Sequence, residues 1–186
     1  MQDMFIPQRI TPDVRRLCRK LGDVDEPVFI AVEPRTDSSV NVCFDDARDQ
    51  AAEHGGSVQC GWLIWEWPGI MVEGVFHGVW RRPDGVLVDV SFKQDGETRV
   101  LFVPDRTRIF ADKMVPAIAH PIGSDPLIRK YISMTSRFDQ LVSDRYRHRL
   151  GEQITLDPEL TELNERKLEI GAHLLTLGRA FRSRGQ

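Results

Sequence analysis

The segment "EGVFHGVWRRPDGVLVDVSF", residues 73–92, constrains the fold most, because two β-forming runs meet there at a turn of defined geometry. Proline at the start of the turn suits a type I geometry, and Gly85 suits the left-handed residue that follows it. The predicted connection is therefore a loop of residues 83–85 with a glycine bulge. Arg82 then faces Val86, and this pairing fixes the register of the whole hairpin.

This register separates an apolar face of the hairpin from a polar face. The apolar face contains Ile70, Val72, Phe76, Trp80, Val86, Val88, Val90 and Phe92. On the polar face His77 and Asp89 are diagonal neighbours, whose Cβ atoms lie about 7 Å apart or somewhat less. A carboxylate can reach an imidazole over that distance. Glu73 lies on the same face and is an alternative acid for orienting the imidazole of His77.

The surrounding pattern predicts an α+β fold built around an antiparallel meander of about four strands, packed against a short helix. β-forming residues alternate in the expected strands, at about 57–66, 70–82, 86–93 and 98–104. A short apolar run at 27–34 indicates a further strand. We expect residues 1–186 to form a single domain, with its core at about 27–110 and a C-terminal helical part at about 125–182.

Helix signals flank the predicted strands. Thr11 and Pro12 predict an N-cap and a first helical residue, and Gly22 predicts the end of that helix. Two Asp-Pro pairs predict the starts of two longer helices, at about 125–145 and 157–182, because aspartate is a good N-cap and proline suits the first helical position.

A further short helix is predicted to begin beside Cys43 and to end at Gly55-Gly56. Asn41 is the predicted N-cap, which places Cys43 in the first helical turn. Free backbone N–H groups and the helix dipole lower the pKa of a thiol in that position. The N–H of Cys43, assisted by the side chain of Asn41, would offer an oxyanion hole.

These residues suggest a hypothesis about chemistry. If the start of the short helix packs on the polar face of the hairpin, Cys43, His77 and Asp89 form a nucleophile, a base and an orienting acid. The thiolate would attack a carbonyl, His77 would keep it ionised and protonate the leaving group, and Asp89 would fix the imidazole tautomer. A thiolate–imidazole pair needs no metal and no organic cofactor, so we expect neither.

The order of these residues resembles the transglutaminase-like branch of the papain-like cysteine enzymes. The matching features are the Cys at a helix start, the strand motif "FHGVW" and the "DG…VDV" strand, within about residues 40–92. The resemblance implies a helix that carries the catalytic Cys and packs against an antiparallel sheet, with catalytic roles for Cys43, His77 and Asp89. The chain differs from the family at "DVS", where Asp-Pro-Thr is more usual, and the twelve-residue spacing between His and Asp is short.

The resemblance implies a hydrolase or acyltransferase that acts on an amide, isopeptide or thioester-type carbonyl of a peptide or protein substrate. Trp65 and Trp67 are candidates for lining a substrate groove, and core packing is the other interpretation of both. The alternative function is a catalytically inactive fold that binds a protein partner. A homodimer through the C-terminal helices is a further hypothesis, and the apolar positions it would use are Leu160, Leu163, Leu168, Leu174 and Leu177.

Composition argues against several other classes of function. A net charge of -3 and a pI of about 6.0 predict no nucleic-acid partner, and no apolar run approaches the roughly 20 residues that span a bilayer. Three cysteines without a C-x-x-C pair argue against a disulfide framework and a structural zinc site, and Cys18 and Cys60 are expected to be buried. The N-terminus lacks the layout of a secretory signal, so we expect a reduced, cytoplasmic setting.

Overall fold

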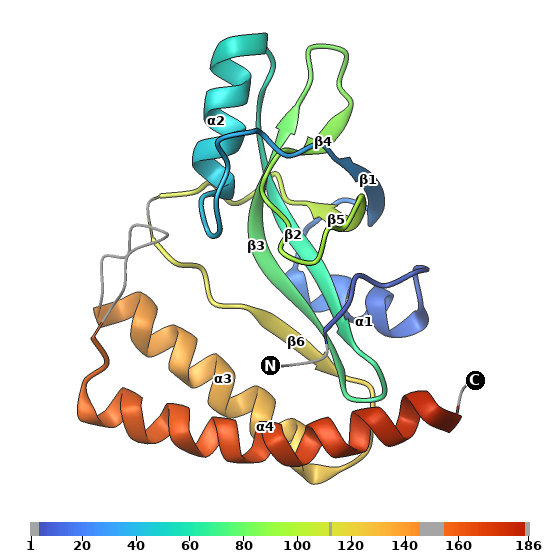
Figure 1. Cartoon of the computed structure of the whole chain (residues 1–186), viewed down its shortest axis with the longest axis vertical. Coiled ribbons are helices and arrows are strands. Elements are labelled where there is room, and N and C mark those ends of the chain that lie inside the picture. Colours follow the sequence, from blue (N-terminus) through green and yellow to red (C-terminus); the bar gives the residue numbers. More distant parts are fainter. Residues whose placement is uncertain (1–3, 112, 146–154, 185–186) are drawn as a thin grey trace.

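The computed structural model describes residues 4–111, 113–145 and 155–184 (Figure 1). The helices are α1 (Pro12–Leu21), α2 (Cys43–His54), α3 (Pro126–Arg145) and α4 (Pro158–Arg184). The strands are β1 (Val28–Val32), β2 (Ser57–Trp67), β3 (Met71–Arg81), β4 (Leu87–Asp89), β5 (Arg99–Pro104) and β6 (Ile118–Pro121). The predicted mixture of helices with a mainly antiparallel sheet is confirmed.

The strands do not form the predicted meander. They follow the order β2-β5-β1-β4-β3-β6, and β2 also pairs with β3, so the first five strands of this order close into a barrel. β1 lies between β5 and β4 and runs parallel to β4. The meander was wrong because it gave the short apolar strand β1 no partners, whereas closure pairs both of its edges and removes the open edges of the sheet.

The predicted register of the β3–β4 hairpin is confirmed. Trp80 pairs with Val88, the N–H of Arg82 donates to the carbonyl of Val86 at 2.8 Å, and Gly85 has a φ of 88°. β4 ends at Asp89, however, instead of continuing to residue 93 as predicted. The side chains at the two ends of the predicted apolar face are therefore not covered: Val86 is 50% exposed and Phe92 is 45% exposed.

The main core is built mainly from side chains of the strands and of α1, and many of its strand side chains are fully buried. These include Trp62, Ile64, Val72, Val79, Val100, Leu101, Phe102 and Val103. Gly61 gives β5 room to approach β2, since a Cβ at this position would lie 2.3 Å from Cζ of Phe102 and 2.3 Å from the carbonyl oxygen of Val103. Glycine at position 61 is thus required for β5 to pack this closely on β2.

Two helices lie against the sheet at separate places. α1 begins as predicted, because the Thr11 side chain accepts a hydrogen bond from the N–H of Val14 at 3.2 Å. Its buried residues Val14 and Leu17 belong to the main core. α2 lies along β3 at the opposite end of the strand from α1 (Figure 1), and its residues Phe44 and Ala47 are buried there.

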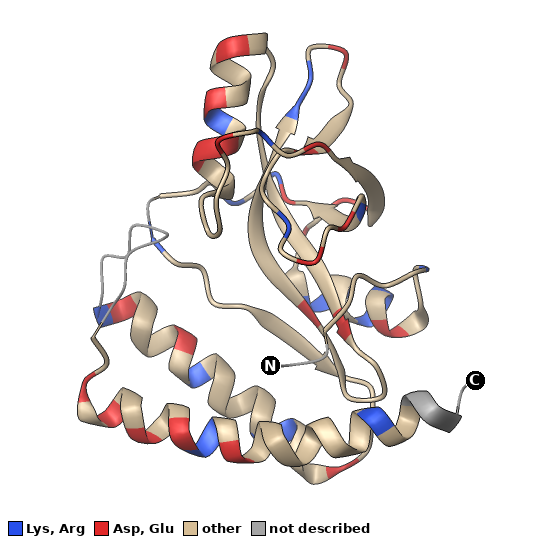
Figure 2. Cartoon of the chain, viewed as in Figure 1, with Lys and Arg blue, Asp and Glu red and all other residues tan. Residues whose placement is uncertain are grey.

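α3 and α4 form a pair that covers the turn between β2 and β3 (Figure 1). The side chains of Asp125 and Asp157 accept hydrogen bonds from backbone N–H groups of the first turns, as the two Asp-Pro pairs predicted. A second apolar cluster joins this pair to the sheet and contains Trp67, Ile70, Met71, Ile128, Tyr131 and Leu174. The acidic residues of α4 lie in its first half, together with basic residues (Figure 2). None of the described helices is both long enough and apolar enough to cross a membrane.

We expect Gly61→Ala to destabilise the fold by at least about 2 kcal/mol, because overpacking a dense core costs about 1–3 kcal/mol and one of the atoms it meets here belongs to the backbone. Gly171→Ala is the matched control, since its Cβ would meet only Cε2 of Tyr131, at 3.4 Å, and alanine favours a helix. Urea unfolding of both variants measures the difference. Equal midpoints would show that the barrel tolerates a side chain at residue 61.

Candidate active site

The candidate site lies where β3 changes partners. Residues 71–74 of β3 pair with β6, whereas Trp80 and Arg81 pair with β4. Between them, residues 75–79 pair with β2 on one edge and meet the first turn of α2 on the other side. Gly78 permits this approach, because a Cβ there would lie 2.5 Å from Cδ1 of Phe44.

Cys43 is the first residue of α2 and is 9% exposed. The side chain of His77 and the backbone N–H of Gly78 are the groups that interact with its thiol. Burial raises the pKa of Cys43, but attraction to His77 and these interactions outweigh burial and hold the pKa below its ordinary value. By contrast, burial raises the pKa of Cys18 and Cys60. Cys43 is therefore the thiol that the structure favours as a thiolate.

His77 connects the thiol to Asp89. Its Nε2 lies 3.0 Å from Oδ2 of Asp89, which leaves Nδ1 as the ring nitrogen available to Cys43. Burial lowers the pKa of His77, but the facing Cys43 and Asp89 raise it to about 9. A raised pKa for the imidazole and a lowered pKa for the thiol both shift the equilibrium toward an ion pair of thiolate and imidazolium.

Asp89 is completely buried at the end of β4 and is fully hydrogen-bonded. Its Oδ1 accepts the N–H and the hydroxyl of Ser91 at 3.0 and 2.6 Å, and its Oδ2 lies 2.7 Å from Nζ of Lys93. Burial raises the pKa of Asp89, but His77 and Lys93 together hold it well below its usual range. The structure thus brings Cys43, His77 and Asp89 together in the order thiol, imidazole, carboxylate.

Asn41 does not cap α2, contrary to the prediction. The residue before the helix is Val42, which makes no side-chain capping bond, while Asn41 is exposed and has a φ of 65°. Asparagine tolerates this left-handed conformation better than most residues, and the turn that it makes shifts the helix start by one residue. The first backbone N–H groups of α2 consequently lack a side-chain cap and remain available to an anion beside Cys43.

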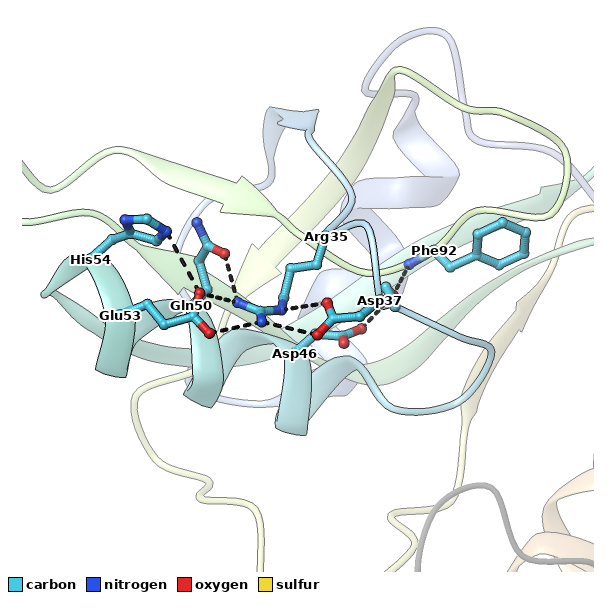
Figure 3. Close-up of polar contacts among 8 residues, drawn as sticks. Arg35, Asp37, Asp46, Gln50, Glu53, His54 and Phe92 are labelled. Atoms are coloured by element: carbon cyan, nitrogen blue, oxygen red, sulfur yellow. Dashed lines mark hydrogen bonds and ion pairs between the residues drawn. The ribbon is translucent and has the colours of Figure 1, made fainter.

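The loop that leads to Cys43 is held by a network of polar side chains (Figure 3). Arg35 donates to Glu53 at 2.9 Å, to Gln50 at 3.0 Å and to Asp37 at 3.1 Å, which ties the loop to the outer side of α2. The hydroxyl of Ser38 donates to Asp46 in the first turn of α2 at 2.7 Å. This network fixes the loop immediately before the nucleophile.

The same loop is also tied to the chain that follows Asp89. The N–H of Phe92 donates to the Ser38 hydroxyl at 2.7 Å, and the N–H of Arg35 donates to the carbonyl of Val90 at 3.0 Å. Sequence reasoning missed Arg35 and Ser38, because their partners lie far away in the chain and "RTDSS" carries no periodic signal.

Glu73 lies apart from the triad rather than beside His77. It pairs with Trp65 and Ala119 and lines a cavity of about 200 Å³ together with Lys20 and Ser136. Burial and the nearby Asp139 raise the pKa of Glu73 to about 7, while Lys167 opposes that rise. Its charged neighbours are therefore residues of α3 and α4, and the alternative role as the orienting acid does not fit this position.

The two tryptophans proposed for a substrate groove are packing residues in this structure. Trp67 is 1% exposed and meets the ring of Tyr131 edge to face at 5.8 Å, so its expected exposure is wrong. Trp65 is partly buried against the main core. The chain continues from Trp67 into a tight turn whose glycine packs on Phe181 of α4, and this helix covers the tryptophan.

Comparisons with protein-family models, with curated proteins and with solved structures find no match to this chain. Within residues 4–111, 113–145 and 155–184, no group of three or more His, Cys, Asp and Glu side chains is arranged to hold a metal ion. The chemistry of the site must therefore be argued from its own residues.

Replacing Glu73 should stabilise the protein at alkaline pH. The pKa of about 7 in the folded state exceeds the value of about 4.3 in an unfolded chain, so the folded protein loses stability as the pH rises from about 4 through 7. We expect Glu73→Gln to be more stable than the wild type by up to about 3.7 kcal/mol at pH 8, because each unit of pKa difference corresponds to about 1.4 kcal/mol, with no gain near pH 4. Denaturant unfolding across this range measures the effect.

The control for this prediction is Glu26→Gln, because the side chain of Glu26 is 86% exposed. It should change stability little at any pH. The prediction is wrong if the difference in unfolding free energy between Glu73→Gln and the wild type is also independent of pH. Glu73 would then be ionised in the folded state at no cost in stability.

Proposed function

We propose that the protein is a cysteine-dependent hydrolase or acyltransferase that acts on an amide or isopeptide-type carbonyl of a peptide or protein. Cys43 is the nucleophile, His77 the proton carrier and Asp89 the acid that orients His77. The observation that carries this proposal is the position of His77, which interacts with the Cys43 thiol and lies 3.0 Å from the buried Asp89 carboxylate.

The reaction follows from these contacts. The Cys43 thiolate attacks the carbonyl carbon and a C–S bond forms, while the carbonyl oxygen takes the negative charge. The C–N bond then breaks as protonated His77 gives its proton to the leaving amine, and a thioester remains on Cys43. Water or a second amine next attacks the thioester, His77 accepts its proton, and the C–S bond breaks to regenerate the thiolate.

The start of α2 supplies the electrostatic part of the proposal. An oxyanion that forms beside Cys43 would meet backbone N–H groups without a side-chain cap and the positive end of the helix dipole. Donors of this kind are typically worth about 2.7–4 kcal/mol to a transition state when removed singly. Asn41 is not needed for this role, because the backbone of the first turn can perform it.

The proposal includes the resemblance to the transglutaminase-like branch of the papain-like enzymes. Its support is the arrangement of a Cys at a helix start with His and Asp on paired strands. The closed barrel and the parallel pairing of β1 with β4 depart from the simple sheet that this resemblance implied. The departure concerns the strands beyond the hairpin and does not involve the contacts of His77 with Cys43 and Asp89.

A second candidate is an inactive fold that binds a protein partner, and the closed state of the site favours it. Cys43 and His77 are 9% and 7% exposed, so substrate needs a local opening to reach the thiol. The partner surface would lie on α4, where Leu168 is 61% exposed and could also serve a homodimer. Leu160 and Leu174 are fully buried, which leaves fewer apolar positions for that surface than the sequence suggested.

The pH dependence of iodoacetamide labelling tests the nucleophile. We expect Cys43 to label quickly at pH 6, whereas Cys18 and Cys60 label slowly until well above pH 8. In His77→Ala, burial acts on the thiol without the opposing imidazolium, so the rate at pH 6 should fall by at least about a hundredfold. Mass spectrometry of each labelled cysteine gives the rates in one sample, with Cys18 and Cys60 as internal controls.

An activated ester tests whether the thiol performs acyl transfer. With p-nitrophenyl acetate, the wild type should release p-nitrophenolate in a burst and carry one acetyl group on Cys43, and Cys43→Ser should not. Adding a primary amine then separates hydrolysis from transfer to an amine. Slow labelling of Cys43 at pH 6, with no burst, would remove the catalytic proposal and favour the binding module.

A further inference from the structure

Lys93 is a buried cation beside the candidate triad that the mechanism above does not use. Its side chain is 7% exposed, and its Nζ lies 2.7 Å from Oδ2 of Asp89 and 2.7 Å from Oγ of Ser91. Lysine is among the residues least often buried, and burial is costly unless the charge is paired. Its presence here needs an explanation in terms of the neighbouring charges.

A tight local turn brings Lys93 to this position. Had β4 continued as a strand, Lys93 would lie about 13 Å along the chain from Asp89, at about 3.3 Å per residue. Instead, Asp89 accepts both the N–H and the hydroxyl of Ser91, an Asx-type turn that ends the strand. The chain bends back at this point, and Nζ of Lys93 reaches the same carboxylate oxygen that His77 contacts.

The charges around this carboxylate balance only if Lys93 is counted. The ionisable groups described at this point are Cys43 from α2, His77 from β3, Asp89 from β4 and Lys93 after it. With the thiolate and the imidazolium formed, these four groups carry two negative and two positive charges. Without Lys93, the buried cluster would keep one negative charge in excess, and burial would favour the uptake of a proton.

We propose that Lys93 is a positioning residue of the Cys43 site: its buried ammonium group holds the Asp89 carboxylate in place and supplies the positive charge that balances a thiolate at Cys43. This inference rests on the proposed function. Lys93 does not touch the reacting atoms and acts through Asp89 and His77. Since an excess negative charge resists the loss of a further proton, removing Lys93 raises the pH at which Cys43 becomes a thiolate.

The test measures the pH profile of Cys43 alkylation by iodoacetamide in the full chain. In Lys93→Met the midpoint of the profile should move upward by about one pH unit or more, which lowers the rate at pH 6 by about tenfold or more. Lys93→Arg restores the charge and should label within about threefold of the wild type. The matched control is Lys113→Met, because Lys113 is exposed and paired with Asp144 instead.

The outcomes separate this inference from the proposed function. If the wild type labels quickly at pH 6 and His77→Ala does not, but Lys93→Met follows the wild-type profile, the role of Lys93 is overturned and the nucleophile stands. If the wild type itself labels slowly at pH 6, both ideas fail together. Circular dichroism checks folding, and Lys93→Gln replaces Lys93→Met if the latter does not fold. This second variant keeps a hydrogen-bond donor without the charge, and a wild-type profile for it would equally overturn the role.

Discussion

The buried carboxylate of Asp89 is the interaction on which the rest of the site depends. It lies at the point where β4 ends, and the hydrogen bonds and ion pair to its two oxygens come from His77, Ser91 and Lys93. Each contact has a structural consequence. The contact with His77 fixes the imidazole, the hydrogen bonds from Ser91 end the strand, and the ion pair with Lys93 brings a cation into the interior. A carboxylate buried this completely remains ionised only because these partners replace water.

The closed barrel explains why Cys43 lies close to this carboxylate. β1 lies next to β4, and beyond the last paired residues the N–H of Glu33 still donates to the carbonyl of Asp89 at 2.8 Å. The loop that follows β1 therefore starts beside the acid. Arg35 and Ser38 then hold that loop against α2 and place Cys43 beside the stretch of β3 that pairs with neither β4 nor β6. In a meander that did not place β1 next to β4, the loop after β1 would not be brought close to Asp89.

The sequence predicted the parts of the structure that depend on interactions between residues close to one another in the chain. The turn at Gly85 fixed the hairpin register and hence the contact between His77 and Asp89, and Asp-Pro pairs marked two helix starts. Features that depend on residues far apart in the chain were not predicted. Nothing near β1 indicates that it separates β4 from β5. The residues up to Lys93 alternate like those of a strand, and they give no sign that the strand ends at Asp89.

The energetics of the cluster argue that it is kept for its chemistry. Well-packed apolar residues in place of a buried ion pair are often neutral or stabilising by about 1–4 kcal/mol, so stability alone gives little reason to bury Cys43, His77, Asp89 and Lys93 together. These groups gather beside the stretch of β3 that lies between its pairing with β6 and its pairing with β4. Strongly shifted pKa values at such a place are typical of functional sites. In the proposed mechanism, the same closeness of charges that weakens the fold would provide a thiolate, an imidazolium and their counter-charges before any substrate binds.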